Sequence, residues 1–432
     1  MKKICVLLCL TLSVNALLAQ NNLLDQLHKE AEAIQPKLVE WRRDFHEHPE
    51  LGNEEFRTAK IVATHLRSLG IETHENIATT GVVGILRGGK PGPVIALRAD
   101  MDGLPVTERG DLPFKSVAST TFAGQKTGIM HACGHDSHIA ILMGTASVLA
   151  KHKNELAGTI KFIFQPAEEG VFDQNEAFGA DAMVKAGVLE NPKVDVAFGL
   201  HINSQIPVGQ IGIKPGSVMA GVDQLYITVK GVQTHGAYPW SGIDPIVTAS
   251  QIVTGLQTIV SRNVKLIDYP AVVSIGSIHG GIRHNIIPEQ VEMIGTIRTL
   301  DLEQRDLIHT RIKEIAEHIA LSAGATAEVR IQEGYPVTYN DPELTMQMHD
   351  ALVNVVGKEN LIQRDAVMGA EDFSYFAREV PSIFFFLGGM NPEKKANEVA
   401  PHHTPDFYLD ESGFYVGVKA FCSLVVNYAE SK

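Results

Sequence analysis

The stretch Val94-Ile-Ala-Leu-Arg-Ala-Asp-Met-Asp-Gly-Leu-Pro105 joins an unalternating apolar run to a pair of aspartates. An apolar run without alternation is typical of a strand that is buried on both faces of an α/β sheet. Similar runs occur further along the chain, at residues 82–86, 160–164, 194–200 and 383–387. Helical spacing of apolar side chains predicts helices at residues 25–48, 54–69 and 137–151. Together these segments predict an α/β domain whose mixed, largely parallel sheet is flanked by helices.

The stretch from residue 217 to residue 332 has a different order of elements. It predicts a strand at 225–229, a helix at 244–260, strands at 271–278 and 289–299, a helix at 302–322 and a strand at 327–332. This is the β-α-β-β-α-β order of a ferredoxin-like α+β unit. We therefore predict that residues 217–332 form a domain inserted into the larger one, which would comprise residues 20–216 and 333–432.

The N-terminus has the pattern of a secretory signal peptide at residues 1–19. Lys2 and Lys3 precede an apolar run from Ile4 to Leu18, and the small residue Ala19 follows. The run is shorter than the roughly 20 residues that a membrane span needs. We expect a cleaved signal and an exported protein, periplasmic or secreted, with an uncleaved anchor as the alternative.

The bulk composition limits the partners and the use of cysteine. The 432 residues carry a formal net charge of −13, which makes nucleic acid and anionic membranes poor partners. Two of the four cysteines lie in the predicted signal peptide, so the mature chain keeps Cys133 and Cys422. Two distant cysteines do not make a disulfide scaffold. One of them is free to act as a metal thiolate.

Residues with metal-ligand chemistry follow the buried runs. Asp100 and Asp102 follow the first run, and Glu168 and Glu169 follow residues 160–164. His201 directly follows residues 194–200, and the segment from Met130 to His138 precedes a predicted helix. In open α/β sheets ligands bind beyond the carboxyl ends of the strands. A single such residue is ordinarily solvated or a cap, but the repeated pattern predicts a site at one rim of the sheet.

Cys133 and His135 lie too close in sequence to share a helix face, so they belong to a turn before the helix at 137–151. The partial positive charge of a helix N-terminus lowers the pKa of a thiol and favours the thiolate. A nucleophilic Cys-His pair remains an alternative. We favour a metal site, because carboxylates and a further histidine are at hand and a thiol hydrolase needs none of them.

The adjacent Glu168 and Glu169 are predicted to have different roles. Neighbouring side chains of an extended segment point to opposite sides. One carboxylate can therefore bind metal while the other faces the water to be activated.

The motifs resemble the M20 metallopeptidase family, most closely its amidohydrolase branch, from about residue 35 to residue 425. The segments that carry the resemblance are Arg98-Ala-Asp-Met-Asp-Gly-Leu-Pro105, Met130-His-Ala-Cys-Gly-His-Asp-Ser-His138, Gln165-Pro-Ala-Glu-Glu-Gly170, Gly199-Leu-His201, Thr234-His-Gly-Ala-Tyr-Pro239, Asn285-Ile-Ile-Pro288, Met368-Gly-Ala-Glu-Asp-Phe373 and His402-His-Thr-Pro405. In that family the inserted domain is a lid that often dimerises.

The resemblance implies two divalent metal ions, zinc or manganese, that activate a water molecule. It implies Glu168 as general base and His235 of the lid as a donor to the oxyanion. Asn285 and Arg298 would bind substrate, and Arg298 would hold its carboxylate. Asp102 would hold a ligand in place, whereas Asp100 replaces a family histidine. The implied metal ligands are Cys133, His135, Glu169, His201 and His403, the last preferred to His402 because Thr-Pro follows it.

The implied activity is removal of the acyl group from N-acyl amino acids, such as hippurate-like conjugates with a free carboxylate, by a homodimer or higher homo-oligomer joined through the lid. Trp240 and the segment Arg283-His284 depart from the family pattern near the expected substrate pocket. The alternatives are a metallocarboxypeptidase or dipeptidase of the same family, and a non-catalytic binding protein on this scaffold.

Overall fold

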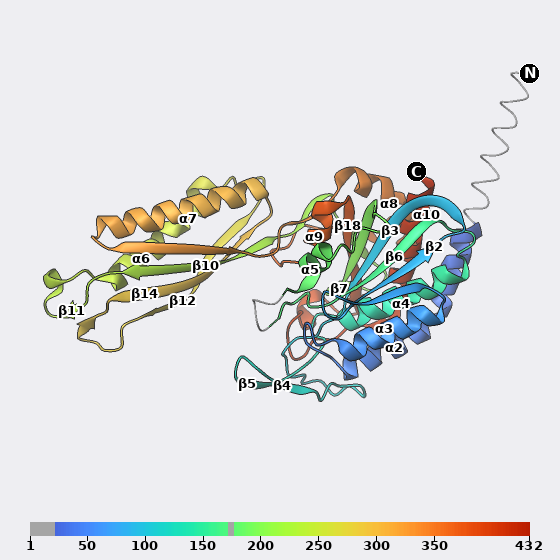
Figure 1. The fold of residues 1–432 in the computed structure, drawn as a ribbon, viewed down its shortest axis with the longest axis horizontal. Helices are drawn as coiled ribbons and strands as arrows, with labels where there is room; N and C mark the ends of the chain where they lie inside the picture. The colour runs from blue at the N-terminus through green and yellow to red at the C-terminus, as the bar shows by residue number, and fades with distance from the viewer. Residues whose placement is uncertain (1–21, 172–176) are drawn as a thin grey trace, which may run out of the picture. The chain divides into compact units, whose positions relative to one another are not determined.

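The computed structural model describes residues 22–171 and 177–432, so the predicted signal peptide at residues 1–19 lies outside the described part of the chain. The chain forms two compact units (Figure 1). The first comprises the described residues up to Gly216, with Asn340–Arg364 and Tyr375–Lys432. The second comprises Ser217–Tyr339 and Asp365–Ser374.

The second unit begins at the residue predicted for the insertion but extends past the predicted end at residue 332. The reason is backbone pairing, since Val222 N–H donates to the Tyr335 carbonyl (2.9 Å) and Gly334 N–H donates to the Val222 carbonyl (3.0 Å). The segment Asp365–Ser374 joins this unit because Ala220 N–H donates to the carbonyls of Val367 and Gly369.

The first unit is built on an eight-stranded mixed sheet, which confirms the predicted fold class. Its order is β1-β2-β6-β3-β7-β18-β8-β17, and the central strands β6, β3, β7 and β18 are parallel to their neighbours in that set. The strands are β1 (Glu72–Ile77), β2 (Gly81–Arg87), β3 (Lys90–Asp100), β6 (Ala157–Gln165), β7 (Val196–Pro207), β8 (Ile211–Ile213), β17 (Leu361–Gln363) and β18 (Ser382–Met390). All the buried runs read from the sequence lie in this sheet.

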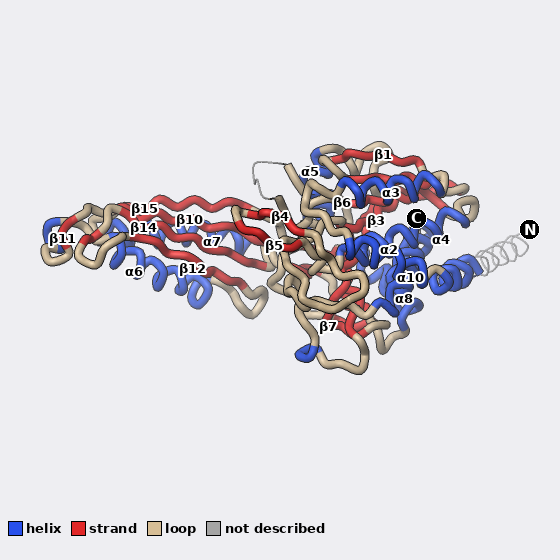
Figure 2. The backbone as a smooth tube through the Cα atoms, turned by 90° about the horizontal axis from the view of Figure 1, so that it is seen from below, coloured by secondary structure: helices blue, strands red, loops and turns tan. Residues whose placement is uncertain are grey.

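Helices pack around this sheet (Figure 2). They are α2 (Gln35–Glu47), α3 (Phe56–Ser68), α4 (His135–Lys151), α5 (Gly179–Lys185), α8 (Pro342–Val356), α9 (Ser374–Glu379) and α10 (Phe414–Glu430). Helix α4 is buried from His135 to Leu149 and contacts α2 and α10. No helix among the described residues is long and apolar enough to cross a membrane.

The predicted helix at residues 25–48 is wrong in one respect, because it is interrupted at Ile34. Residues 22–33 are helical, and α2 starts at Gln35 with Pro36 in its first turn. Proline lacks the N–H that a continuous helix would use there.

The second unit has the predicted ferredoxin-like order. Its antiparallel sheet runs β12-β14-β10-β15, and α6 and α7 lie together on one face of it (Figure 1). The elements are β10 (Gly221–Lys230), α6 (Pro245–Thr258), β12 (Ala271–Gly280), β14 (Gln290–Thr299), α7 (Leu302–Ser322) and β15 (Thr326–Glu333). Alternate residues of β10 meet apolar residues of both helices in a separate core.

Short strand pairs complete the fold. They are β4 (Ser119–Phe122) with β5 (Gln125–Gly128), β11 (Thr234–His235) with β13 (Ile286–Ile287), and β9 (Gly216–Met219) with β16 (Thr338–Asn340).

A buried ion pair ties α7 to the sheet of the second unit. Asp223 on β10 is 1% exposed and accepts hydrogen bonds from Arg305 Nε (3.0 Å) and His309 Nε2 (2.6 Å). Burial opposes the charged form, but His309 and Arg305 lower the pKa of Asp223 to about 2.

We predict that Asp223→Asn destabilises the protein by roughly 3 kcal/mol, because removing one partner of a buried pair leaves the other charge uncompensated. A carboxyl group whose pKa is lowered on folding stabilises the folded protein at pH values above its ordinary pKa of 3.8. This contribution is lost as the pH falls from about 4 toward 2. Guanidinium unfolding measures the effect, with the solvent-exposed Lys230→Gln as control. Equal midpoints for Asp223→Asn and wild type would contradict it.

Candidate metal centre

The ends of the central strands bring the predicted ligands of the first unit together. Strand β3 ends at Asp100, β6 ends at Gln165 just before Glu168, and β7 contains His201. Helix α4 begins at His135, directly after the turn that carries Cys133. The parallel strands share this edge of the sheet, as the sequence predicts.

Cys133 lies at the centre of the cluster. Its Sγ is 3.3 Å from His201 Nε2, 3.3 Å from His403 Nε2 and 3.7 Å from His402 Nδ1. The ligand atoms of Cys133, Glu169 and His403 lie within 4.8 Å of one another. The Cys133 sulfur therefore lies within reach of ligand atoms from His201, His403 and Glu169.

Glu169 joins a second group of donors to the first. The ligand atoms of His135, Glu168 and Glu169 also lie within 4.8 Å of one another. Glu169 Oε1 forms an ion pair with His403 Nε2 at 2.9 Å, whereas His135 Nε2 is buried without a hydrogen-bond partner. A buried polar atom without a partner is costly, and its position beside Glu168 and Glu169 fits a divalent cation between them.

Asp102 contacts two of the predicted ligands, His135 and Glu169. His135 Nδ1 is 2.9 Å from the Asp102 carbonyl and 3.2 Å from Asp102 Oδ1, so Nδ1 carries the proton and the Nε2 lone pair faces the donors. Asp102 Oδ2 accepts the backbone N–H of Glu169 at 2.8 Å. One carboxylate thus fixes a histidine tautomer and the backbone of the acidic turn.

Backbone groups set the tautomers of the other buried histidines. His201 Nδ1 donates to the Ile202 carbonyl (2.6 Å), which leaves its Nε2 lone pair toward Cys133. His402 Nε2 accepts from Ser204 N–H (3.2 Å), so its Nδ1 is a donor toward the sulfur. Burial lowers the pKa of His402 to about 3, so the ring is neutral and cannot offer both lone pairs. His201 can bind metal through Nε2, whereas His402 can only donate to Cys133, which leaves His403 as the candidate ligand of the pair.

Asp100 is used in a different way. It accepts Arg98 Nη1 at 2.7 Å and His138 Nδ1 at 2.6 Å. His138 Nε2 in turn accepts Ile202 N–H at 2.8 Å. The resulting chain connects β3, α4 and β7 beneath the cluster. Sequence reasoning missed His138, although its motif contains it.

The electrostatics of the cluster favour a bound cation. Burial, with Glu169 and Glu168 beside it, raises the pKa of the Cys133 thiol well above its ordinary value. The prediction that the helix N-terminus lowers this pKa is therefore wrong, because desolvation and the carboxylates outweigh the helix. Burial opposes protonation of His135, yet Asp100 and Asp102 raise its pKa to about 10, so without a cation Nε2 also binds a proton, which a bound cation would displace. A divalent cation would compensate this negative charge and deprotonate the thiol, whereas a free nucleophilic thiol is disfavoured.

Glu55 supports the turn that carries Glu168, and sequence reasoning did not find it. Ala167 has a left-handed backbone (φ 52°), and its N–H donates to Glu55 Oε1 at 2.7 Å. Thr80 Oγ1 donates to Glu55 Oε2 at 2.5 Å. Burial and the nearby Asp102 raise the pKa of Glu55 to about 8. Gly52 lies so close that a Cβ there would be 2.3 Å from the Gly170 carbonyl.

The second unit brings His235 and Asn285 together but not Arg298. His235 pairs with Ile286 between β11 and β13, and Gly236 N–H donates to the Asn285 carbonyl at 2.8 Å. Ala237 N–H donates to His235 Nδ1 (3.0 Å), which places the proton on Nε2. Arg298 lies near the other end of β14, eight residues beyond Gln290, or roughly 26 Å at the usual rise of a strand.

Comparisons with known proteins agree with this geometry. The model of peptidase family M20/M25/M40 matches residues 96–427. Thermostable carboxypeptidase 2 of Saccharolobus solfataricus is 40% identical over 94% of this chain and 99% of its own. An N-acetylcysteine deacetylase of Bacillus subtilis is 38% identical over 92% of this chain and 98% of its own.

A solved structure from Bacillus subtilis, described as a dinuclear metal-binding peptidase from the M20 family, is 36% identical with a TM-score of 0.77. It covers 93% of this chain and 99% of its own. The chain belongs to peptidase family M20/M25/M40, and it is a hydrolase of amide or peptide bonds.

Proposed function

We propose that this hydrolase removes the acyl group from N-acyl amino acids, with Glu168 as the general base. The observation that carries the proposal is the cluster at Cys133, in which lone pairs of His135 and His201 and the Glu169 carboxylate converge beside a second, separate carboxylate. The divided roles predicted for the adjacent glutamates are compatible with this arrangement.

The residues that would hold two divalent ions are Cys133, His135, Glu169, His201 and His403. Bound there, the ions would lower the pKa of water and polarise the amide carbonyl. Thiolate and imidazole suit zinc, and carboxylate also suits manganese. Glu168, whose Oε2 is 3.9 Å from His135 Nε2, would accept the water proton and deliver it to the leaving nitrogen. Donation from His235 Nε2 would stabilise the oxyanion.

A homodimer through the lid is part of the proposal. Strand β12 is an edge of its sheet, and its side chains Val272 and Ile278 are 37% and 49% exposed. Such an edge offers unpaired backbone groups to a second copy. The length of β14 between the His235 pair and Arg298 means that one lid cannot direct both groups at one small substrate. We therefore assign His235 to the site of the partner subunit.

We also propose export, on the strength of Lys2, Lys3, the apolar run to Leu18 and the small Ala19. N-terminal sequencing of the mature protein would then begin at Gln20.

The substrate class is tested with the metal-reconstituted enzyme and matched sets of N-acyl amino acids, their C-terminal amides, and dipeptides. We expect the N-acyl amino acids to have the highest kcat/KM. Their amides should be roughly tenfold to a hundredfold poorer, since a hydrogen bond to a charged group is worth about 1.5–3 kcal/mol. Arg298→Met should remove this difference, and the exposed Arg262→Met should keep it. Preferred cleavage of dipeptides would support the carboxypeptidase or dipeptidase alternative instead.

Two variants should separate metal binding from proton transfer. Glu168→Gln should retain the metal content but lose roughly 10²- to 10⁴-fold in kcat, as expected for a missing general base. Cys133→Ser should lose metal, because a hydroxyl is a poorer ligand than a thiolate. Metal analysis and turnover are measured on the same samples, before and after chelation and re-addition of Zn²⁺ or Mn²⁺. Full activity of the metal-free enzyme would instead support the alternative in which Cys133 is the nucleophile.

Mixing His235→Ala with Glu168→Gln tests the origin of the lid histidine. Each homodimer should be nearly inactive, and His235→Ala should retain its metal. If His235 acts on the partner's site, mixed dimers regain activity, because one of their sites combines an intact Glu168 with an intact His235. Subunit exchange is verified with differently tagged chains. Exchange without any regain would place His235 in its own subunit's site or outside catalysis.

A further inference from the structure

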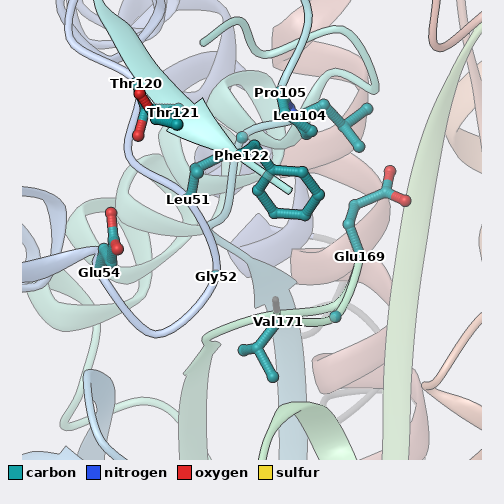
Figure 3. Close-up of a pocket in the computed structure, with 12 residues that line it drawn as sticks. Leu51, Gly52, Glu54, Leu104, Pro105, Thr120, Thr121, Phe122, Glu169 and Val171 are labelled. Atoms are coloured by element: carbon teal, nitrogen blue, oxygen red, sulfur yellow. The ribbon is translucent and has the colours of Figure 1, made fainter. Parts of the chain in front are cut away.

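A cavity of about 190 Å³ lies in the first unit next to the candidate metal centre (Figure 3). Three segments form its walls, namely the loop before α3, the segment after Asp102, and the β4–β5 hairpin, and the acidic turn completes it. The lining residues are Leu51, Gly52, Glu54, Gly103, Leu104, Pro105, Thr120, Thr121, Phe122, Glu169, Gly170 and Val171. Apart from Glu169, none of these lining residues has a role in the proposed chemistry.

The cavity adjoins the metal cluster at Glu169. This residue lines the cavity and also lies 2.9 Å from His403 at the metal cluster. Figure 3 shows the Phe122 ring between Leu51 and the Glu169 side chain. The cavity is therefore next to the position that the carbonyl of a substrate would take at the cluster.

The charge of the lining decides which half of the substrate fits. Its ionisable side chains, among the described residues, are the carboxylates Glu54 and Glu169. With Glu169 bound to metal, the Glu54 carboxylate remains to repel the free carboxylate of an amino-acid product, because like charges are unfavourable. The lining is otherwise made of apolar side chains, glycines and threonines. It therefore suits the acyl half, provided that this half is uncharged.

The size of the cavity limits the acyl group. An apolar protein cavity of about 150 Å³ can hold one benzene molecule. A volume of about 190 Å³ therefore takes a single six-membered ring or an aliphatic chain of similar size, whereas a fused or doubled ring system would extend beyond it.

We propose that this cavity is the acyl-binding pocket, and that it selects neutral apolar acyl groups up to about the size of benzoyl. The inference rests on the proposed function, since it assigns one half of the N-acyl amino acid to a surface of the same site. Phe122 and Leu104 are its specificity-determining side chains.

Both of these side chains are held by backbone pairing. Phe122 pairs with Gln125 at the end of the β4–β5 hairpin, where Ala123 and Gly124 take left-handed backbone angles of 50° and 76°. Leu104 exchanges backbone hydrogen bonds of 2.9 and 3.0 Å with Met130, in the segment that leads to Cys133. Leu104 is thus tied to the segment that carries Cys133, and Phe122 is held within its own hairpin.

The test uses the metal-reconstituted enzyme and one amino acid carrying acetyl, benzoyl, naphthoyl or succinyl groups. For the wild type we expect benzoyl to exceed both naphthoyl and succinyl in kcat/KM. Phe122→Ala should lower the benzoyl-to-acetyl ratio roughly tenfold or more, as apolar pocket contacts typically discriminate by 10- to 200-fold. It should also raise the naphthoyl-to-benzoyl ratio. Glu54→Gln should raise the succinyl-to-benzoyl ratio.

Val117→Ala is the matched control, because Val117 precedes the same hairpin but is 87% exposed. Its acyl ratios should equal those of the wild type, and metal content should be equal in all variants. An enzyme that hydrolyses N-acyl amino acids while Phe122→Ala leaves every ratio unchanged would overturn the pocket alone. An enzyme that cleaves none of the N-acyl series would instead overturn the proposed function. Selective loss of dipeptide cleavage in Glu54→Gln would overturn the preference for neutral groups.

Discussion

The hydrogen bonds of Asp102 are the interaction on which the site depends. Its carbonyl and one carboxylate oxygen hold Nδ1 of His135, and its other carboxylate oxygen holds the backbone of Glu169. A histidine has a lone pair to offer a cation only where its other nitrogen carries the proton. Asp102 therefore fixes both the tautomer of His135 and the backbone of the turn that carries Glu169. It lies just after the end of the central strand β3.

The same rule of tautomers organises the remaining histidines. Ile202 accepts from His201 and donates to His138, and Ser204 donates to His402. Short backbone stretches of β7 thus select which rings point lone pairs at Cys133 and which donate protons. The cost is a set of buried carboxylates beside a thiol and a histidine, Cys133 and His135, whose pKa values are both raised. A cation relieves that cost, so the site is unfavourable as a dry protein interior and favourable as a metal site.

Much of the fold could be predicted because its strands are buried on both faces. Strands β2, β3, β6, β7 and β18 are continuous apolar runs, and α4 starts where the ligand motif ends. Strand β1 was not predicted, because its burial alternates and its sequence is largely polar. Helix α10 was not predicted either, because it is apolar on nearly all sides and shows no single helical stripe.

The sequence by itself determined the α/β class, the inserted ferredoxin-like unit and the residues that carry ligand chemistry, since these follow from local periodicity and from motifs. Only the tertiary structure decided how His402 differs from His403, what Asp100 pairs with, and that Glu55 holds the turn before Glu168. It also separated Arg298 from His235 by the length of a strand. The sequence shows which side chains can bind a metal ion or donate a hydrogen bond. Which nitrogen of a histidine carries the proton depends on a hydrogen-bond partner from a distant segment of the chain, and only the fold brings that partner into contact.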